Sequence, residues 1–231
     1  MQQKYEINAM NFLYVSGNPF AYWVSTNQLN FIGKSSKIKD FCRYTGSLNK
    51  TGNNDKYLRL IWEVSKKDFL NKWVPYNKGG RFRKWYGNND LVIDISEKSL
   101  EFYKTNKTSN LLNKKFWYGP GITWTALTSG NFNARFFKNE ALSDFKGASI
   151  FPSSSDVYSF LAYMNSSSFN FYANIIAPTL DYNIGQIVEI PFSSTKLPER
   201  FICMSKECVK FAQEDWDSFE TSWDFKKHPL V

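Results

Sequence analysis

The part of this sequence best suited to chemistry is a basic segment, residues 72–87, which holds five cations and no acid. Large aromatic residues stand between the cations, and the pair Gly79 and Gly80 lies near the middle. An unpaired buried cation costs several kcal/mol, so we expect the segment to lie at a surface. Aromatic residues can anchor it there while the cations face outward, as in loops that grip nucleic-acid phosphates. The alternative is a solvated hairpin whose lysines only keep the protein soluble.

The net charge of +8 is unevenly distributed along the chain. Residues 1–150 hold 23 Lys and Arg against 11 Asp and Glu, whereas residues 151–231 hold 6 against 10. This asymmetry predicts that a polyanion binds to the first part. We expect a basic, mainly β part at 1–150 and a helical, acidic part at 151–231, packed together as one compact unit.

Hydrophobic periodicity predicts a mixed α+β fold, with a β-sheet core, flanking helices and a helical C-terminal part. Alternation on both sides of a turn at 128–130 is typical of a hairpin. We expect the acidic and aromatic tail after residue 214 to fold back on the body. Strands are predicted at 5–8, 57–64, 91–95, 121–127, 131–137 and within 182–191. Helices are predicted near 19–29, 37–42, 96–103, 153–164, 169–176 and 197–213, and a long polar loop at 44–56.

Two sets of residues are candidates for contacting a polyanion. Clustering in the basic part predicts that six cations neutralise phosphates: Arg43, Lys56, Lys78, Arg81, Arg83 and Lys84. Five side chains on predicted loops or the hairpin are candidates for reading base edges, since Asn suits adenine and Arg suits guanine: Asn53, Asn54, Asn131, Asn133 and Arg135. For each Asn, a turn role is an equal alternative. We expect three tryptophans to be core residues rather than stacking platforms: Trp62, Trp85 and Trp124.

Catalytic and cofactor motifs are not apparent in the sequence. The single histidine, His228, is close to the end of the chain, and three cysteines without C-x-x-C spacing predict neither a disulfide framework nor a zinc site. Amino-methyltransferases that act on adenine carry an Asn-Pro-Pro-aromatic motif. The stretch Asn18-Pro19-Phe20 lacks one of its two prolines. No apolar run approaches the ~18 residues of a membrane span. We therefore predict a cytoplasmic chain with no metal, no cofactor and no catalysis of its own.

Several sequence blocks together resemble the C-terminal, target-recognition region of the PglX family, the adenine-specific DNA methyltransferases of BREX phage-defence systems. The Thr-Gly-x-Asn loop and the Met164-Asn165-Ser166 element also resemble target-recognition domains of TaqI-like methyltransferases and type I specificity subunits. The family's Gly-x-x-Thr-Gly lead-in is replaced here by Ser47-Leu48-Asn49-Lys50-Thr51-Gly52. The blocks are 21–25, 51–54, 57–64, 73–80, 82–87, 121–124, 129–130, 147–151, 161–166 and 214–225.

The resemblance implies sequence-specific recognition of double-stranded DNA for an adenine-specific methyltransferase in phage defence or restriction-modification. An upstream domain would bind S-adenosylmethionine and transfer the methyl group, and other defence subunits would be further partners. Two alternatives stay open. One is a protein-interaction module that docks other defence subunits, and the other is a free-standing enzyme, which the missing motifs disfavour.

Overall fold

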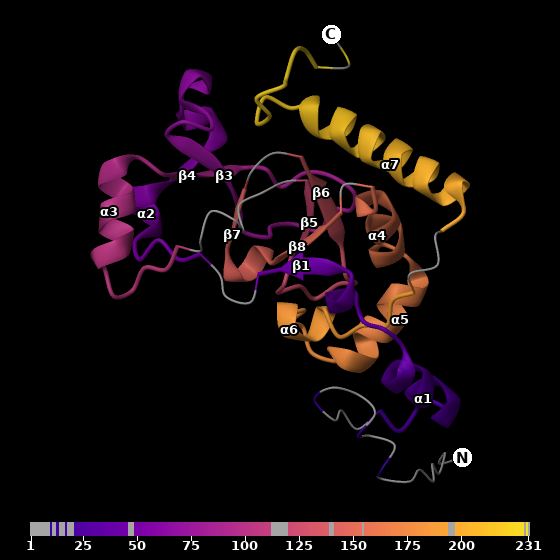
Figure 1. Ribbon diagram of the computed structural model, residues 1–231. Coiled ribbons are helices and arrows are strands. Elements are labelled where there is room, and N and C mark those ends of the chain that lie inside the picture. Colours follow the sequence, from indigo (N-terminus) through magenta and orange to yellow (C-terminus); the bar gives the residue numbers. More distant parts are fainter. Residues whose placement is uncertain are drawn as a thin grey trace.

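The computed structural model describes residues 21–45, 49–111, 120–138, 141–153, 155–193 and 197–228, with residues 10, 13, 17 and 230. The strand predicted at 5–8 lies outside these residues. Two four-stranded sheets and several helices form the mixed α+β fold that the sequence predicts (Figure 1). No helix in the described part of the chain is long and apolar enough to cross a membrane.

The first sheet is fully antiparallel and contains the predicted hairpin. Its hairpin strands pair Ile122 with Phe136, which confirms the predicted hairpin. The strands lie in the order β1 (Cys42–Tyr44), β8 (Ser149–Pro152), β5 (Gly121–Trp124) and β6 (Ala134–Phe137).

The second sheet contains part of the basic segment as an inner strand. Its order is β2 (Leu58–Leu60), β4 (Leu91–Asp94), β3 (Trp73–Asn77) and β7 (Leu142–Ser143), with only β3 and β7 parallel. Four of the five β3 residues are buried, so the prediction that all of 72–87 lies at the surface is wrong. Only Lys72 precedes this strand, and the other four cations follow it at 78–84, which leaves residues 73–77 without charge.

The helices follow the predictions except where short polar caps intervene. A capping box joins Ser25 and Gln28, so the first helix begins later than predicted. Asn183 accepts a hydrogen bond from the Gln186 N–H and starts a helix where a strand was predicted. The α-helices are α1 (Thr26–Lys34), α2 (Asn54–Tyr57), α3 (Glu97–Thr105), α4 (Val157–Met164), α5 (Ser167–Ile176), α6 (Ile184–Ile187) and α7 (Glu199–Asp217).

Short 3-10 turns account for other differences from the predictions. The strand predicted at 57–64 ends at Leu60, because η3 (Ile61–Glu63) follows, with the Glu63 carboxylate accepting from the Leu60 N–H. The helical turn predicted at 37–42 is confirmed as η2 (Ile38–Asp40). Two more 3-10 turns lie close to the residues discussed below: η4 (Lys66–Asp68) and η6 (Phe145–Gly147).

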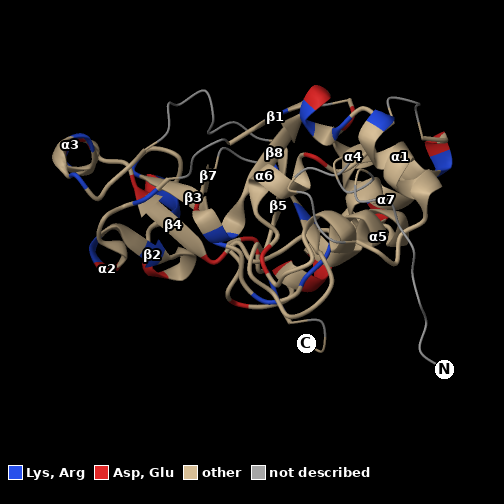
Figure 2. Ribbon diagram, turned by 90° about the horizontal axis from the view of Figure 1, so that it is seen from below, with Lys and Arg blue, Asp and Glu red and all other residues tan. Residues whose placement is uncertain are grey.

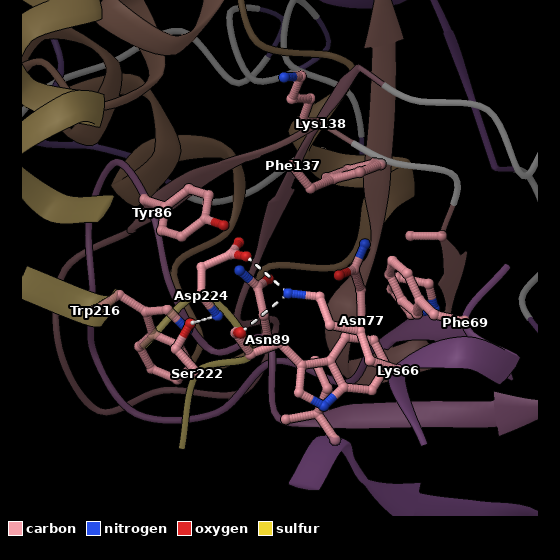
Figure 3. A pocket seen from close by; sticks show the side chains of 14 residues that line it. Lys66, Phe69, Asn77, Tyr86, Asn89, Phe137, Lys138, Trp216, Ser222 and Asp224 are labelled. Carbon is pink, nitrogen blue, oxygen red and sulfur yellow. Dashed lines mark hydrogen bonds and ion pairs between the residues drawn. The ribbon is translucent and has the colours of Figure 1, made fainter. Parts of the chain in front are cut away.

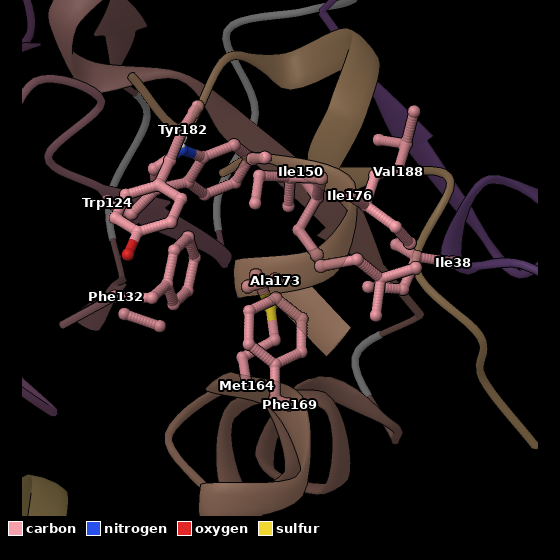
Figure 4. Packing of buried hydrophobic residues seen from close by; sticks show 14 of the residues in the cluster. Ile38, Trp124, Phe132, Ile150, Met164, Phe169, Ala173, Ile176, Tyr182 and Val188 are labelled. Atoms are coloured by element: carbon pink, nitrogen blue, oxygen red, sulfur yellow. Dashed lines mark hydrogen bonds between the residues drawn. The ribbon is translucent and has the colours of Figure 1, made fainter. Parts of the chain in front are cut away.

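The main hydrophobic core joins the first sheet to the helices that follow it. Figure 4 shows Trp124 and Ile150 from the sheet packed near Met164 and Phe169 from α4 and α5. A smaller cluster lies under the second sheet beside α2 and α3: Tyr57, Leu58, Val74, Tyr76, Ile93, Tyr103 and Leu142. The boundary predicted at residue 150 falls inside β8, which pairs with both β1 and β5.

Candidate nucleic-acid interface

The cations of the basic segment lie mostly on the connection between β3 and β4, residues 78–90, which we call the basic connection. The connection leaves the second sheet and reaches the edge of the first. The Trp85 N–H donates to the Ala134 carbonyl, and the Trp85 carbonyl accepts from the Phe136 N–H, each at 2.8 Å. The basic connection therefore extends the first sheet beyond β6.

The backbone of the basic connection is unusual. Five of its residues have positive φ: Gly79, Gly80, Trp85, Gly87 and Asn88. A Cβ at Gly79 would lie 2.5 Å from the Lys146 carbonyl oxygen, so this position requires glycine. Trp85, at φ 73°, is a bulky side chain in a strained conformation, and the two hydrogen bonds to β6 hold it there.

Arg135 fixes the basic connection from inside the molecule. Its side chain is 1% exposed, and its guanidinium donates to the carbonyls of Gly79 and Arg83 and to Asn133 Oδ1. Burial, with a smaller effect of the nearby Arg83 charge, lowers the pKa of Arg135 to about 10. The guanidinium therefore stays protonated at neutral pH and ties two points of the basic connection to β6.

Burial also decides two of the base-reading candidates. Asn133 is 0% exposed, and Arg135 lies beside it. Both side chains are enclosed and already hydrogen-bonded within the protein, so the structure offers neither of them to a base edge and argues against their base-reading assignment. Their position in the predicted hairpin leads us to expect exposed side chains. In the structure, Trp85 of the basic connection pairs with β6 at Arg135 and covers this edge of the first sheet.

Arg83 and Lys84 face the C-terminal helices. Arg83 Nη1 lies 3.0 Å from Asp215 Oδ2 of α7, and its guanidinium lies 5.1 Å from the Trp216 ring centroid. Lys84 Nζ donates to the Asn165 carbonyl at 3.2 Å. We call these two cations the covered half of the basic segment, because the charged end of each side chain already contacts another part of the protein.

Asn165, from the Met164-Asn165-Ser166 element, has a structural role at the edge of β6. Its carboxamide accepts from the Ala134 N–H and donates to the Ala134 carbonyl, each at 3.0 Å. The side chain thus pairs with the strand much as a neighbouring backbone would. This contact places the end of α4 beside the covered half.

Three other phosphate candidates, Lys56, Lys78 and Arg81, form what we call the open half. Among the described residues, their side chains make no ion pair and no hydrogen bond. Lys56 Nζ lies 5.2 Å from the Tyr57 ring centroid, which orients the cation without neutralising it. Lys78 borders an open hollow together with Asn54, and the same hollow is lined by Asp55 and Glu63. The cations of the open half are therefore exposed or half-buried and not held in ion pairs among the described residues, although acids lie near Lys78.

The Thr-Gly-x-Asn loop leads into α2 beside the open half. Thr51 Oγ1 donates to Asn54 Oδ1 at 2.7 Å, and Asn53 Oδ1 accepts from the Lys56 N–H at 3.1 Å. These contacts make the loop an N-terminal cap, which is why the predicted 44–56 loop ends in a helix. Both asparagines are exposed, and neither Nδ2 has a hydrogen-bond partner within the described ranges.

Arg43 lies apart from these groups, whereas Asn131 follows Gly130, which approaches Phe82 of the basic connection. Arg43 is exposed on β1, and two strands separate it from β6, a distance of about 14 Å at ordinary strand spacing. Asn131 is exposed in the loop before β6. The structure does not bring Arg43 together with the basic connection, and its phosphate role stays a prediction.

Figure 2 shows Lys and Arg spread over both ends of the molecule, with acidic residues interspersed among them. Asp90 is the acid that links the two halves, because the charges of Arg83, Arg135 and Arg81 all act on it. Burial raises the pKa of Asp90, and these three arginines partly oppose the rise. Asp90 therefore offsets part of the positive charge of the basic connection.

The tryptophans and the tail differ in part from the predictions. Trp124 is fully buried and Trp85 packs against the main core, but Trp62 is 47% exposed, so its core assignment is wrong. The predicted return of the tail is confirmed, because Trp216 is buried and Trp223 packs edge-on against Phe69 at 4.4 Å between ring centroids. The pairing of tail acids with specific cations has no local signal in the sequence.

Comparison with known proteins gives a consistent result. No family model matches the chain. It is 33% identical, over 98% of its length, to adenine-specific methyltransferase PglX of Lacticaseibacillus casei (strain Zhang). It is also 33% identical, over 96% of its length, to adenine-specific methyltransferase BrxX of Escherichia coli O9:H4 (strain HS). The matched part is a C-terminal region, and the chain spans only about a fifth of the length of these relatives.

Proposed function

We propose that this chain, being similar over nearly its whole length to a C-terminal region of the PglX and BrxX methyltransferases, recognises double-stranded DNA for such an enzyme. Methyl transfer from S-adenosylmethionine would take place in another domain, because this sequence contains no Asn-Pro-Pro-aromatic motif. The biological setting would be BREX phage defence, by analogy with the family.

The observation that carries the proposal is the open half. Lys56 and Lys78 make no ion pair among the described residues and lie next to a loop whose Asn53 and Asn54 have unused amide donors, and Arg81 adds a third cation, exposed on the basic connection. Phosphate contacts fix the register of a protein on DNA, and carboxamide groups read base edges. The two kinds of group needed for recognition therefore occur side by side.

We expect a division of labour in the bound state. The open half would hold the phosphate backbone, and Asn53, Asn54 and Asn131 would contact base edges. The adenine to be methylated would then be presented for extrusion into the catalytic domain, because a base inside the duplex cannot be reached. The covered half would shape the surface rather than contact DNA.

The test removes the three charges of the open half and keeps side chains of moderate length at these positions. In the triple variant Lys56→Gln, Lys78→Gln, Arg81→Gln, duplex affinity measured by fluorescence anisotropy should fall. The slope of log affinity against log salt should flatten by about 2.7, since each lost phosphate contact contributes about 0.9.

A matched control removes the same charge elsewhere. Lys34, Arg200 and Lys206 are exposed on α1 and α7, away from the basic connection. Their triple Gln variant should leave the salt slope within about half a unit, because these cations are not proposed to touch phosphate. Equal losses in both triple variants would refute a localised DNA site and leave only attraction by net charge.

A protein-docking role is a second candidate, supported by the outer face of α7. Phe201, Met204 and Phe211 are exposed there, by 39%, 55% and 65%. Exposed apolar residues spaced by three and seven positions can meet a partner helix. Competition separates the two functions, because a docked defence subunit should stay bound in excess DNA whereas a duplex-dependent one should be displaced.

A further inference from the structure

A cavity of about 220 Å³ opens where the two sheets, the basic connection and the tail meet (Figure 3). Strand β3 contributes Asn77, the basic connection contributes Tyr86 and Asn89, and the end of β6 contributes Phe137. Other lining residues are Lys66, Phe69, Lys138, Trp216, Trp223 and Asp224. None of the open-half cations borders the cavity.

Asn77 is the residue that needs explanation. It is 5% exposed, and its buried Nδ2 has no hydrogen-bond partner. Among the described residues its whole carboxamide is unpaired, although its backbone carbonyl accepts from the Asp144 N–H at 2.9 Å. A buried polar group left unpaired costs stability, so such groups are rare unless they have a function. Figure 3 shows the carboxamide directed into the cavity.

The other walls of the cavity suit a flat ring. Phe137 faces the cavity from β6, and Phe69 with Trp223 closes another side. Aromatic side chains of this kind bind planar heterocycles through their faces and edges. The volume is below the roughly 300–1,000 Å³ of sites for drug-sized ligands, which favours a single ring system.

Two lysines and one aspartate stand at the rim of the cavity. Lys66 Nζ lies 3.2 Å from the Trp223 carbonyl and 3.4 Å from Asp224 Oδ1, and Lys138 is exposed at the opposite side. An exposed ion pair of this length is weak, so Lys66 can exchange Asp224 for an anionic group of a ligand. A ring with an attached phosphate therefore matches both the interior and the rim.

We propose that this cavity binds an adenine-type base of a nucleotide. A carboxamide pairs in two places with the neighbouring amino group and ring nitrogen of adenine, and Asn77 has both of its groups unused. The base would lie against Phe69, Phe137 and Trp223, with its phosphate near Lys66 and Lys138. The source is either a nucleotide extruded from DNA, distinct from the adenine that the catalytic domain would take, or a free adenosine nucleotide.

Adenosine monophosphate is the first probe, titrated into the 231-residue chain. Trp216 and Trp223 line the cavity, so binding should quench tryptophan fluorescence to a saturating level. Asn77→Leu should weaken binding roughly tenfold or more, because the paired contact is lost. Asn174→Leu, the same change at an exposed position of α5, should leave binding unchanged. Ribose 5-phosphate, which lacks the base, should not bind.

A DNA duplex containing 2-aminopurine is the second probe and distinguishes the source. If the cavity takes an extruded base, the 2-aminopurine fluorescence should change with the parent chain and with Asn174→Leu, but not with Asn77→Leu. Binding of either probe that depends on Asn77 supports the proposal. Failure of both probes overturns it, as does ribose 5-phosphate binding as tightly as adenosine monophosphate.

A structural role for Asn77 is tested separately. Leu at this position should leave the melting temperature unchanged or raise it, since no hydrogen bond within the protein is lost. Asn77→Ser cannot overfill the cavity and should show the same loss of binding. A lower melting temperature with unchanged nucleotide binding would overturn the proposal. The open-half triple variant should still bind adenosine monophosphate, so failure of the DNA proposal and failure of this one can be told apart.

Discussion

The open and covered halves of the basic segment have similar composition but different surroundings. Lys78 and Arg81 make no ion pair among the described residues, whereas Arg83 meets Asp215 and Lys84 meets the Asn165 carbonyl only a few positions later. The difference is made by residues more than 80 positions away in the sequence. A count of charges along a chain therefore does not tell which charges are available to a ligand.

The largest effect is expected at the residue that holds the two halves in place. Arg135→Met leaves Asn133 and two carbonyls without their buried donor, which should lower the free energy of unfolding by roughly 2–4 kcal/mol. Urea denaturation measures this loss. Lys138→Met, an exposed cation just past β6, is the control and should change stability by less than about 0.5 kcal/mol. Equal stability of Arg135→Met and the parent would show that the basic connection does not depend on Arg135.

The next effect separates the halves directly. Arg83→Gln with Lys84→Gln should lower the free energy of unfolding by about 1 kcal/mol, because an ion pair, a cation–π contact and one hydrogen bond are lost. Duplex affinity should fall less than about threefold, in contrast to the open-half triple variant. A salt slope that flattens by about two units in this double variant would show that the covered half also contacts phosphate, and would contradict the difference between the two halves.

A smaller effect should convert part of the covered half into open surface. Asp215→Asn frees Arg83, so duplex affinity should rise about twofold and the salt slope should steepen by up to about one unit. Glu214→Gln is the matched control, because Glu214 pairs with Lys210 on the same helix and not with the basic connection. The same rise in both variants would indicate a general effect of removing an acid.

The smallest effect concerns Asp90 and the pH dependence of stability. Burial raises the folded-state pKa of Asp90 above its ordinary value of 3.8, so the folded chain binds this proton more tightly than the unfolded chain. Stability should therefore be lost as pH rises from 3.8 through the folded pKa. Asp90→Asn should remove this loss, which we expect to be less than about 1 kcal/mol because nearby arginines oppose it. Urea denaturation across that pH window measures the difference, and identical curves would contradict the assignment.

Local patterns were enough to predict much of the fold. Helix α3, helix α4 and the β5–β6 hairpin follow from periodicity and a turn, which act over a few residues, although neither Ser96 nor Asp156 makes a side-chain capping hydrogen bond. The site was harder to predict, because availability of a charge is a tertiary property. Nothing local in the sequence distinguishes the buried Arg135 from the exposed Arg81. Similarly, the uncharged stretch 73–77 of the basic segment is an inner strand because β4 and β7 flank it.

Strand β8 has a consequence for engineering relatives of this chain. It lies between β1 and β5, so its residues pair with strands that are encoded both far upstream and nearby. A chimaera spliced at residue 150 would join half of this strand from one parent to half from another, inside the hydrogen-bonded sheet. Exchange of specificity between relatives should instead use crossover points outside residues 149–152, where the sheet can be inherited intact.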